Sequence, residues 1–130
     1  MIAIRPALPD DAPRMLEILQ ENQQTLAGVD YTAWTAYTLV LVREGIVEGL
    51  IQSLLGTPYA VVTELAISRV HHGKGYGIKL ANAMELLLRT VGVSAYVTYA
   101  ATEHGEMRDM LTRYGFQETG HGTGYVRRLA

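Results

Sequence analysis

The hydrophobic and polar positions follow two different periods along the chain, which predicts strands in some segments and helices in others. Segments rich in β-branched and aromatic residues, with apolar side chains in alternation or in short runs, are typical of strands. These segments are residues 3–5, 37–42, 46–55, 59–67, 93–100, 116–118 and 125–129. Apolar side chains at intervals of three and four residues predict a helix from Ala12 to about Asn22, with Met15, Ile18 and Leu19 facing inward.

Two further segments carry the helical period. The first stripe consists of Gly77, Leu80, Ala81, Met84, Leu87, Leu88 and Val91. The second consists of Met107, Met110, Leu111 and Tyr114. Gly115 follows at once and predicts the end of this last helix, because glycine readily adopts the left-handed conformation of a C-cap.

Turn residues separate these segments. Pro9–Pro13 predicts an acidic helix cap with proline in the first turn, and Glu44-Gly45 predicts a hairpin turn. Residues 23–36 give no firm element. The predicted order is β-α-(α)-β-β-β-α-β-α-β-β, without repeats or linkers. We therefore expect a single α/β domain over residues 1–130, with a mixed sheet.

Composition narrows the class of protein. The chain has 130 residues, of which 48 % are apolar and 18 % charged, and this balance is ordinary for a globular domain. The absence of cysteine excludes a disulfide framework, a cysteine nucleophile and a thiolate metal site. None of the four histidines has the i, i+4 partner of a helical zinc site, so we expect no metal. No apolar run approaches the ~20 residues of a membrane span, and the start lacks the pattern of a signal peptide. We expect a cytoplasmic protein without a membrane partner.

The formal charge of −2 divides unevenly along the chain. Residues 1–65 carry 3 basic and 8 acidic side chains, whereas residues 66–130 carry 8 basic and 5 acidic ones. The near-neutral balance argues against a general nucleic-acid binder, which is usually strongly basic. The asymmetry fits one face for an anion and another for a cation, although charges scattered by chance would give the same division.

The segment Gly73-Lys74-Gly75-Tyr76-Gly77 lies between a predicted strand and a predicted long helix. Glycines allow successive backbone N–H groups to point into one concavity, and the helix N-terminus adds partial positive charge there. A phosphate or pyrophosphate is the natural ligand, although a tight strand-to-helix turn would also favour glycine. The dinucleotide fingerprint fails at Ile78, and no Ser or Thr follows a Gly-Lys pair as a phosphate loop requires.

Residues 65–77 resemble the acyl-CoA-binding motif of the GNAT superfamily of N-acetyltransferases, Arg/Gln-x-x-Gly-x-Gly/Ala after an apolar strand. Gly75 and Gly77 match this motif, whereas His72 replaces the Arg or Gln. Residues 4–7 with Asp11, residues 45–49 and residues 111–116 resemble three further blocks of the family in the same order. The resemblance implies a mixed, centrally splayed sheet flanked by helices.

The resemblance also implies a cofactor site. Backbone groups of Leu65, Ala66 and Ile67 would pair with the pantetheine arm of acetyl-CoA, and an N–H near Ala66–Ile67 would stabilise the oxyanion. The pyrophosphate would be held by His72, Gly73, Lys74, Gly75, Tyr76 and Gly77. His104 stands where the family often has an asparagine that contacts the arm; it would do the same, or cap the helix that follows.

Glu64 and Tyr99 are the candidate catalytic residues. An alkylamine is mostly protonated at neutral pH, and Glu64, which interrupts an apolar strand just before the acyl site, would accept its proton. A solvated face of the sheet would also accommodate Glu64. Many family members protonate the leaving thiolate with a tyrosine at the position of Leu111, which cannot donate a proton. Tyr99 is the replacement that we favour, with Tyr114 and Tyr125 as further options.

The implied activity is N-acetyl transfer from acetyl-CoA to a primary amine of a small molecule, peptide or protein, by direct attack in a ternary complex. Tyr31, Trp34 and His121 are the candidate acceptor-binding residues, by position alone. The alternative is a weak or inactive acyl-CoA-binding sensor or partner module with the same fold. Modification of a nucleic-acid amine is disfavoured by the net charge. A homodimer is compatible with the resemblance, because many relatives pair through sheet edges.

Overall fold

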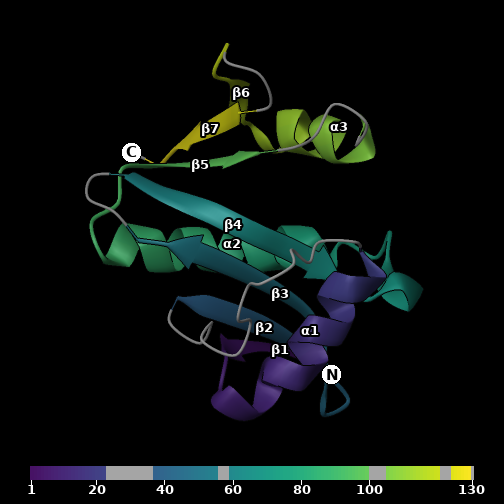
Figure 1. The fold of residues 1–130 in the computed structure, drawn as a ribbon. Coiled ribbons are helices and arrows are strands. Elements are labelled where there is room, and N and C mark those ends of the chain that lie inside the picture. Colours follow the sequence, from purple (N-terminus) through teal and green to yellow (C-terminus); the bar gives the residue numbers. More distant parts are fainter. Residues whose placement is uncertain (23–36, 56–58, 100–104, 121–123, 130) are drawn as a thin grey trace. The chain divides into compact units, whose positions relative to one another are not determined.

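The computed structural model describes residues 1–22, 37–55, 59–99, 105–120 and 124–129. Its elements follow the predicted alternation (Figure 1). In chain order they are β1 (Ile2–Pro6), the 3₁₀ helix η1 (Pro9–Asp11), α1 (Ala12–Glu21), β2 (Thr38–Arg43), β3 (Ile46–Leu54), β4 (Tyr59–Ile67), the 3₁₀ helix η3 (Arg69–His71), α2 (Tyr76–Thr90), β5 (Ala95–Tyr99), α3 (Gly105–Tyr114), β6 (Gln117–Glu118) and β7 (Gly124–Arg128).

The strands form a seven-stranded mixed sheet in the order β1-β2-β3-β4-β5-β7-β6. β4 and β5 pair in parallel. The pairs β1–β2, β2–β3, β5–β7 and β6–β7 are antiparallel. A mixed sheet, together with the three α-helices among the described residues, confirms the predicted α/β fold class.

The chain divides into two compact units, and β4 and α2 contribute to both. The first unit consists of Met1–Ser53 and Glu64–Met84, and the second of Leu54–Thr63 and Glu85–Ala130. In the first unit, α1 packs its predicted apolar stripe into a cluster that includes Val40, Leu50 and Ala66. Ile18 and Leu19 have no exposed surface, so the helical period identified the buried face of α1 correctly.

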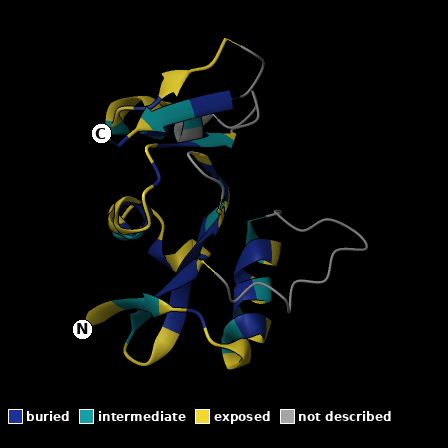
Figure 2. Ribbon diagram, turned by 90° about the vertical axis from the view of Figure 1, so that its left-hand side faces the viewer, coloured by how far each residue is buried: buried dark blue, intermediate teal, exposed yellow. Residues whose placement is uncertain are grey.

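β3 contains a bulge beside α1. Leu41 pairs with Gly49 and Val42 pairs with Val47, so Glu48 is the extra residue of the strand. A bulge turns the extra side chain away from ordinary alternation. Here the Arg14 guanidinium holds the bulge, because its Nε donates to the Val47 carbonyl at 2.8 Å and its Nη2 to Glu48 at 2.7 Å. β3 is buried at every residue except its two ends, and Figure 2 shows the buried parts of the ribbon in dark blue.

In the second unit, the parallel β4–β5 ladder is short. It pairs Tyr59–Val61 with Ala95–Val97. At the next position the Thr98 hydroxyl donates to the Val62 carbonyl at 3.1 Å. The hydrogen bond between β4 and β5 at Val62 is thus made by a side chain, whereas the preceding pairs belong to the backbone ladder. The ring of Tyr96 packs edge-on against Phe116, with 5.2 Å between the ring centroids.

Two local predictions need correction. Val91 lies beyond the end of α2 and is 44 % exposed, because the helix ends at Thr90. Asp11 precedes α1 but makes no side-chain cap bond to it. Its carboxylate instead accepts hydrogen bonds from the Arg5 guanidinium and from the Leu8 N–H at 2.7 Å. The optional helix within 23–36 and the turn at 56–58 lie outside the described residues. Among the helices that are described, none has the length and apolarity to span a membrane.

Candidate functional site

The glycine segment connects β4 to α2 within the first unit, as predicted. α2 begins at Tyr76, and the Lys79 N–H makes a helical bond to the Gly75 carbonyl. The N–H groups of Tyr76, Gly77 and Ile78 therefore precede the first intrahelical bond and have no carbonyl partner inside the helix. Such N–H groups, with the helix dipole, favour an anion.

The backbone at this loop requires glycine and leaves room in front of it. Gly73 and Gly75 both have φ of +79°, a left-handed conformation that other residues rarely adopt. A Cβ built on Gly73, Gly75 or Gly77 would meet no atom within 4 Å. The first two glycines are thus needed for conformation, and no side chain or distant backbone crowds any of the three. A requirement for tight strand-to-helix packing would instead place atoms against the missing Cβ.

His72 and Ile67 make a contact that the sequence does not indicate. The His72 ring nitrogen Nε2 lies 2.8 Å from the Ile67 carbonyl oxygen. A carbonyl only accepts, so Nε2 carries the proton, and Nδ1 of the neutral ring is an acceptor. His72 can therefore donate to an anion only when its ring is doubly protonated. The same Ile67 carbonyl accepts a hydrogen bond from Asn22 Nδ2 at 2.9 Å, which ties the end of α1 to the end of β4.

Glu64 lies half-buried in β4, immediately before Leu65, Ala66 and Ile67. Burial raises the pKa of its carboxyl from 4.5 to about 7. Desolvation is the only cause, and within the described part of the chain no hydrogen bond or ion pair reaches this side chain. A carboxyl with a pKa near neutrality and a free face has the property of a general base.

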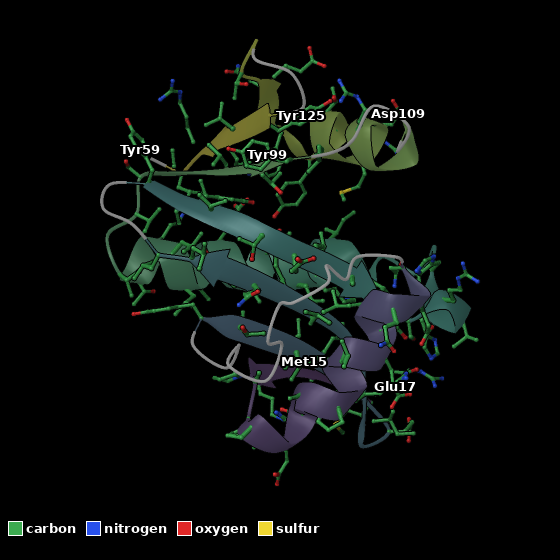
Figure 3. All side chains as sticks on the ribbon, viewed as in Figure 1. Met15, Glu17, Tyr59, Tyr99, Asp109 and Tyr125 are labelled. Atoms are coloured by element: carbon green, nitrogen blue, oxygen red, sulfur yellow. The ribbon has the colours of Figure 1, made fainter. Side chains whose placement is uncertain are left out.

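Tyr99, Tyr114 and Tyr125 all belong to the second unit, and Figure 3 labels Tyr99 on β5 and Tyr125 on β7. Tyr99 ends β5 and is 64 % exposed. Tyr125 is buried and donates to Glu118 at 3.4 Å, under the guanidinium of Arg108. Desolvation first, and then the charge of Glu85, raise the pKa of Tyr114 to about 12. The raised pKa of Tyr114 and the bond from Tyr125 to Glu118 make these two hydroxyls poor proton donors.

Four of the predicted contact residues lie outside the described residues. They are Tyr31, Trp34, His104 and His121. Leu111, at the position of the family's usual tyrosine, is described and is 4 % exposed inside the second unit. Its burial confirms that the residue serves as core.

A set of charged residues beside the glycine loop escaped the sequence analysis. Glu48 accepts from Arg14 and contacts the ring of His71, whose other nitrogen faces the Lys74 ammonium at 3.0 Å. Glu48 and His71 are each 8 % exposed. A glutamate within the apolar run of β3 is the signal that could have indicated a partnered buried charge, because an isolated one is costly.

Comparison with known proteins identifies the fold. No protein-family model and no curated protein sequence gave a match. Among solved structures, Ard1 from Thermoplasma volcanium aligns with a TM-score of 0.84 at 20 % identity, over 99 % of this chain and 98 % of that one. The PaiA N-acetyltransferase from Thermoplasma acidophilum, in complex with coenzyme A, aligns at 0.84 and 15 % identity over 98 % and 99 % of the two chains. An acetyltransferase of the GNAT family from Staphylococcus aureus aligns at 0.84 and 11 % identity over 100 % of both. The chain therefore has the fold of the GNAT acetyltransferases.

Proposed function

We propose that this protein transfers an acetyl group from acetyl-CoA to a primary amine, by direct attack in a ternary complex. One observation carries the proposal. An uncrowded loop with left-handed Gly73 and Gly75 leads directly into the first-turn N–H groups of α2, in a fold shared with an N-acetyltransferase solved in complex with coenzyme A. This combination suits the pyrophosphate of coenzyme A better than it suits a structural turn.

Each described residue has a defined role in the proposal. Acetyl-CoA would bring the acetyl group as a thioester. The N–H groups of Gly73, Gly75, Tyr76 and Gly77 would hold its phosphates, with Lys74 adding charge. Leu65, Ala66 and Ile67 would align its pantetheine arm along β4. Because the Ile67 carbonyl already accepts two hydrogen bonds, Ile67 would contribute its N–H.

Glu64 would act as the general base. The acceptor arrives as an ammonium ion and must lose a proton before its nitrogen can attack the acetyl carbonyl carbon. A carboxylate with a pKa of about 7 can take that proton near neutral pH, directly or through water. The nitrogen forms the amide bond, the bond to sulfur breaks, and an N–H near Ala66–Ile67 would stabilise the negative charge on the carbonyl oxygen. Tyr99 would return a proton to the departing sulfur.

The acceptor pocket belongs to the same proposal. Tyr31, Trp34 and His121 would line it, and His104 would contact the pantetheine arm or cap α3. The acceptor would be a primary amine of a small molecule, peptide or protein.

A binding module without activity is the second candidate. It is favoured by Leu111, a buried apolar residue at the place of the family's acid. Such a module would bind acetyl-CoA through the same loop and release it unchanged.

Titration calorimetry with acetyl-CoA tests the proposal first, followed by an acetylation screen over a library of amines. We expect binding, and transfer to at least one amine. Absence of binding up to ~1 mM acetyl-CoA would overturn both candidates. Binding without transfer to any amine, and without hydrolysis, would favour the binding module.

The variant Glu64→Gln tests the base. We expect it to bind acetyl-CoA as the natural protein does and to lose at least about a hundredfold in kcat, the size of a general-base contribution. Its pH–rate profile should lack the limb near pH 7. A profile and a rate unchanged from those of the natural protein would remove Glu64 from the mechanism.

A further inference from the structure

A chain of side-chain contacts runs from α1 to the glycine loop, entirely within the first unit. Arg14 Nη2 donates to Glu48 Oε1 at 2.7 Å. The other carboxylate oxygen of Glu48 contacts Nε2 of His71, and Nδ1 of His71 lies 3.0 Å from the Lys74 ammonium. Three separate elements, α1, β3 and η3, thus bring one connected set of charged and polar groups to the loop.

The chemistry of the two ends fixes the state of the imidazole in the middle. The Glu48 carboxylate can only accept, so His71 Nε2 must carry a proton. The Lys74 ammonium can only donate, so His71 Nδ1 must offer its lone pair. Both contacts are satisfied by a neutral ring protonated at Nε2, and by no other form.

The bulge of β3 makes this arrangement possible. It adds Glu48 as an extra residue, and Arg14 holds both that carboxylate and the adjacent Val47 carbonyl. Arg14 also lies 3.5 Å from Glu17 and 3.7 Å from Glu21, which keeps the guanidinium in place. Arg14 therefore orients the Glu48 carboxylate independently of the contact that this carboxylate makes with His71.

We propose that Glu48 and His71 are positioning residues that hold the Lys74 ammonium beside the glycine loop, where it supplies the side-chain charge for the pyrophosphate. This inference rests on the proposed function. His72 occupies the place of the family's Arg or Gln, but its Nε2 proton is committed to the Ile67 carbonyl. Lys74, oriented by a buried pair that begins on another strand, takes over that task in this chain.

The variant Glu48→Gln tests the positioning. The Arg14 guanidinium only donates and would take the new amide oxygen, which turns the amide N–H group toward His71 Nε2. The ring proton would then move to Nδ1 and oppose Lys74. We expect the Kd for coenzyme A to rise about tenfold, a change of about 1.4 kcal/mol. Pantetheine, which lacks the pyrophosphate, should bind as it does to the natural protein.

Variants at His71 and Lys74 separate positioning from general damage. His71→Leu should weaken coenzyme A binding as Glu48→Gln does, whereas His71→Gln keeps one donor and one acceptor and should restore most of the affinity. Lys74→Met should give the same loss, and adding Glu48→Gln to it should cause no further loss. In a Lys79→Met background, which removes a lysine outside the contact chain, the Glu48→Gln effect should persist.

Nitrogen NMR of the protein without ligand gives a readout independent of binding. We expect His71 to be protonated at Nε2 and bare at Nδ1, and the proton to change nitrogen in Glu48→Gln. A proton on Nδ1 in the natural protein would overturn the inference, as would independent, multiplying losses from Glu48→Gln and Lys74→Met. If the natural protein binds no coenzyme A, the proposed function fails instead, and the tautomer measurement still decides the contact chain.

Discussion

The phenolic oxygen of Tyr96 donates a 2.7 Å hydrogen bond to a carboxylate oxygen of Glu85, and the bond is buried inside the second unit. The same carboxylate oxygen of Glu85 accepts a second hydrogen bond, from Arg127 Nε at 2.8 Å. Burial, together with the bond to Glu85, raises the pKa of Tyr96 far above its ordinary value, so the hydroxyl remains a donor. One carboxylate thereby joins α2, β5 and β7.

Tyr96→Phe should destabilise the protein by about 1.5–3 kcal/mol, because it removes a hydrogen bond to a buried charge and leaves the carboxylate one donor short. The measurement is urea unfolding at neutral pH. Tyr99→Phe is the matched control on the same strand. Its side chain is 64 % exposed, and we expect a change within about 0.5 kcal/mol. Equal effects of the two variants would contradict the role assigned to Glu85.

The stability of the protein should depend on pH through Glu64. Its folded pKa of about 7 lies above its ordinary value of 4.5, so the folded state holds the proton more tightly than the unfolded state. This contribution is fully present below pH 4.5 and is lost as the pH rises through 7. Relative to Glu64→Gln, the natural protein should lose about 1–2 kcal/mol between about pH 5 and about pH 8, after allowance for its partial exposure. Urea unfolding of both proteins at the two pH values measures this difference. The same difference in unfolding free energy at both pH values would contradict the raised pKa.

Two glycines of the loop should respond in opposite directions to alanine. Gly77 lies inside α2 with open space around it, so Gly77→Ala should stabilise the fold by about 0.5–1 kcal/mol. Gly75 has φ of +79°, and Gly75→Ala should cost about 1–2 kcal/mol. Thermal unfolding of the two variants under identical conditions makes the comparison. Stabilisation by both would mean that the left-handed conformation at Gly75 is not required.

Gly49→Ala should crowd the first unit. A Cβ at Gly49 would lie 2.6 Å from Ile67 Cδ1, 3.1 Å from Leu80 Cδ1 and 3.3 Å from the Ala66 carbonyl oxygen. The two side chains can yield partly and the backbone hardly at all, so we expect a loss of about 1–3 kcal/mol in chemical unfolding. The double variant Gly49→Ala with Ile67→Val should recover part of that loss. A double variant less stable than the sum of the two single losses would locate the crowding elsewhere.

The sequence predicted the elements whose signal is local. β4 was predicted residue for residue, because an apolar run between turn signals marks a buried strand. The buried face of α1 was predicted from the helical period. The end of α3 was predicted from Gly115, whose φ of +107° is a conformation that glycine readily adopts. The same local signals located the glycine loop between β4 and α2.

The parts that could not be predicted depend on partners distant in sequence. A bulge depends on the neighbouring strand, so the residues of β3 alone do not reveal that Glu48 is extra. The raised pKa of Glu64 is a consequence of burial, which only the folded chain determines. The bond from His72 to Ile67 likewise depends on backbone conformation, and the sequence does not indicate it.

The extra residue of β3 has a consequence for how this hairpin tolerates changes in length. Side chains of a strand alternate between two faces, so a one-residue shift exchanges the faces for everything on one side of it. The bulge absorbs such a shift, because Val47 and Leu50 are three residues apart and yet both lie in the buried cluster with Val40. Deletion of Glu48 would leave Val42 paired with Val47 and Arg43 with Ile46, so Val47 would still face the core. Removal of position 48 would thus keep the faces of the hairpin and take away the carboxylate that Arg14 and His71 contact.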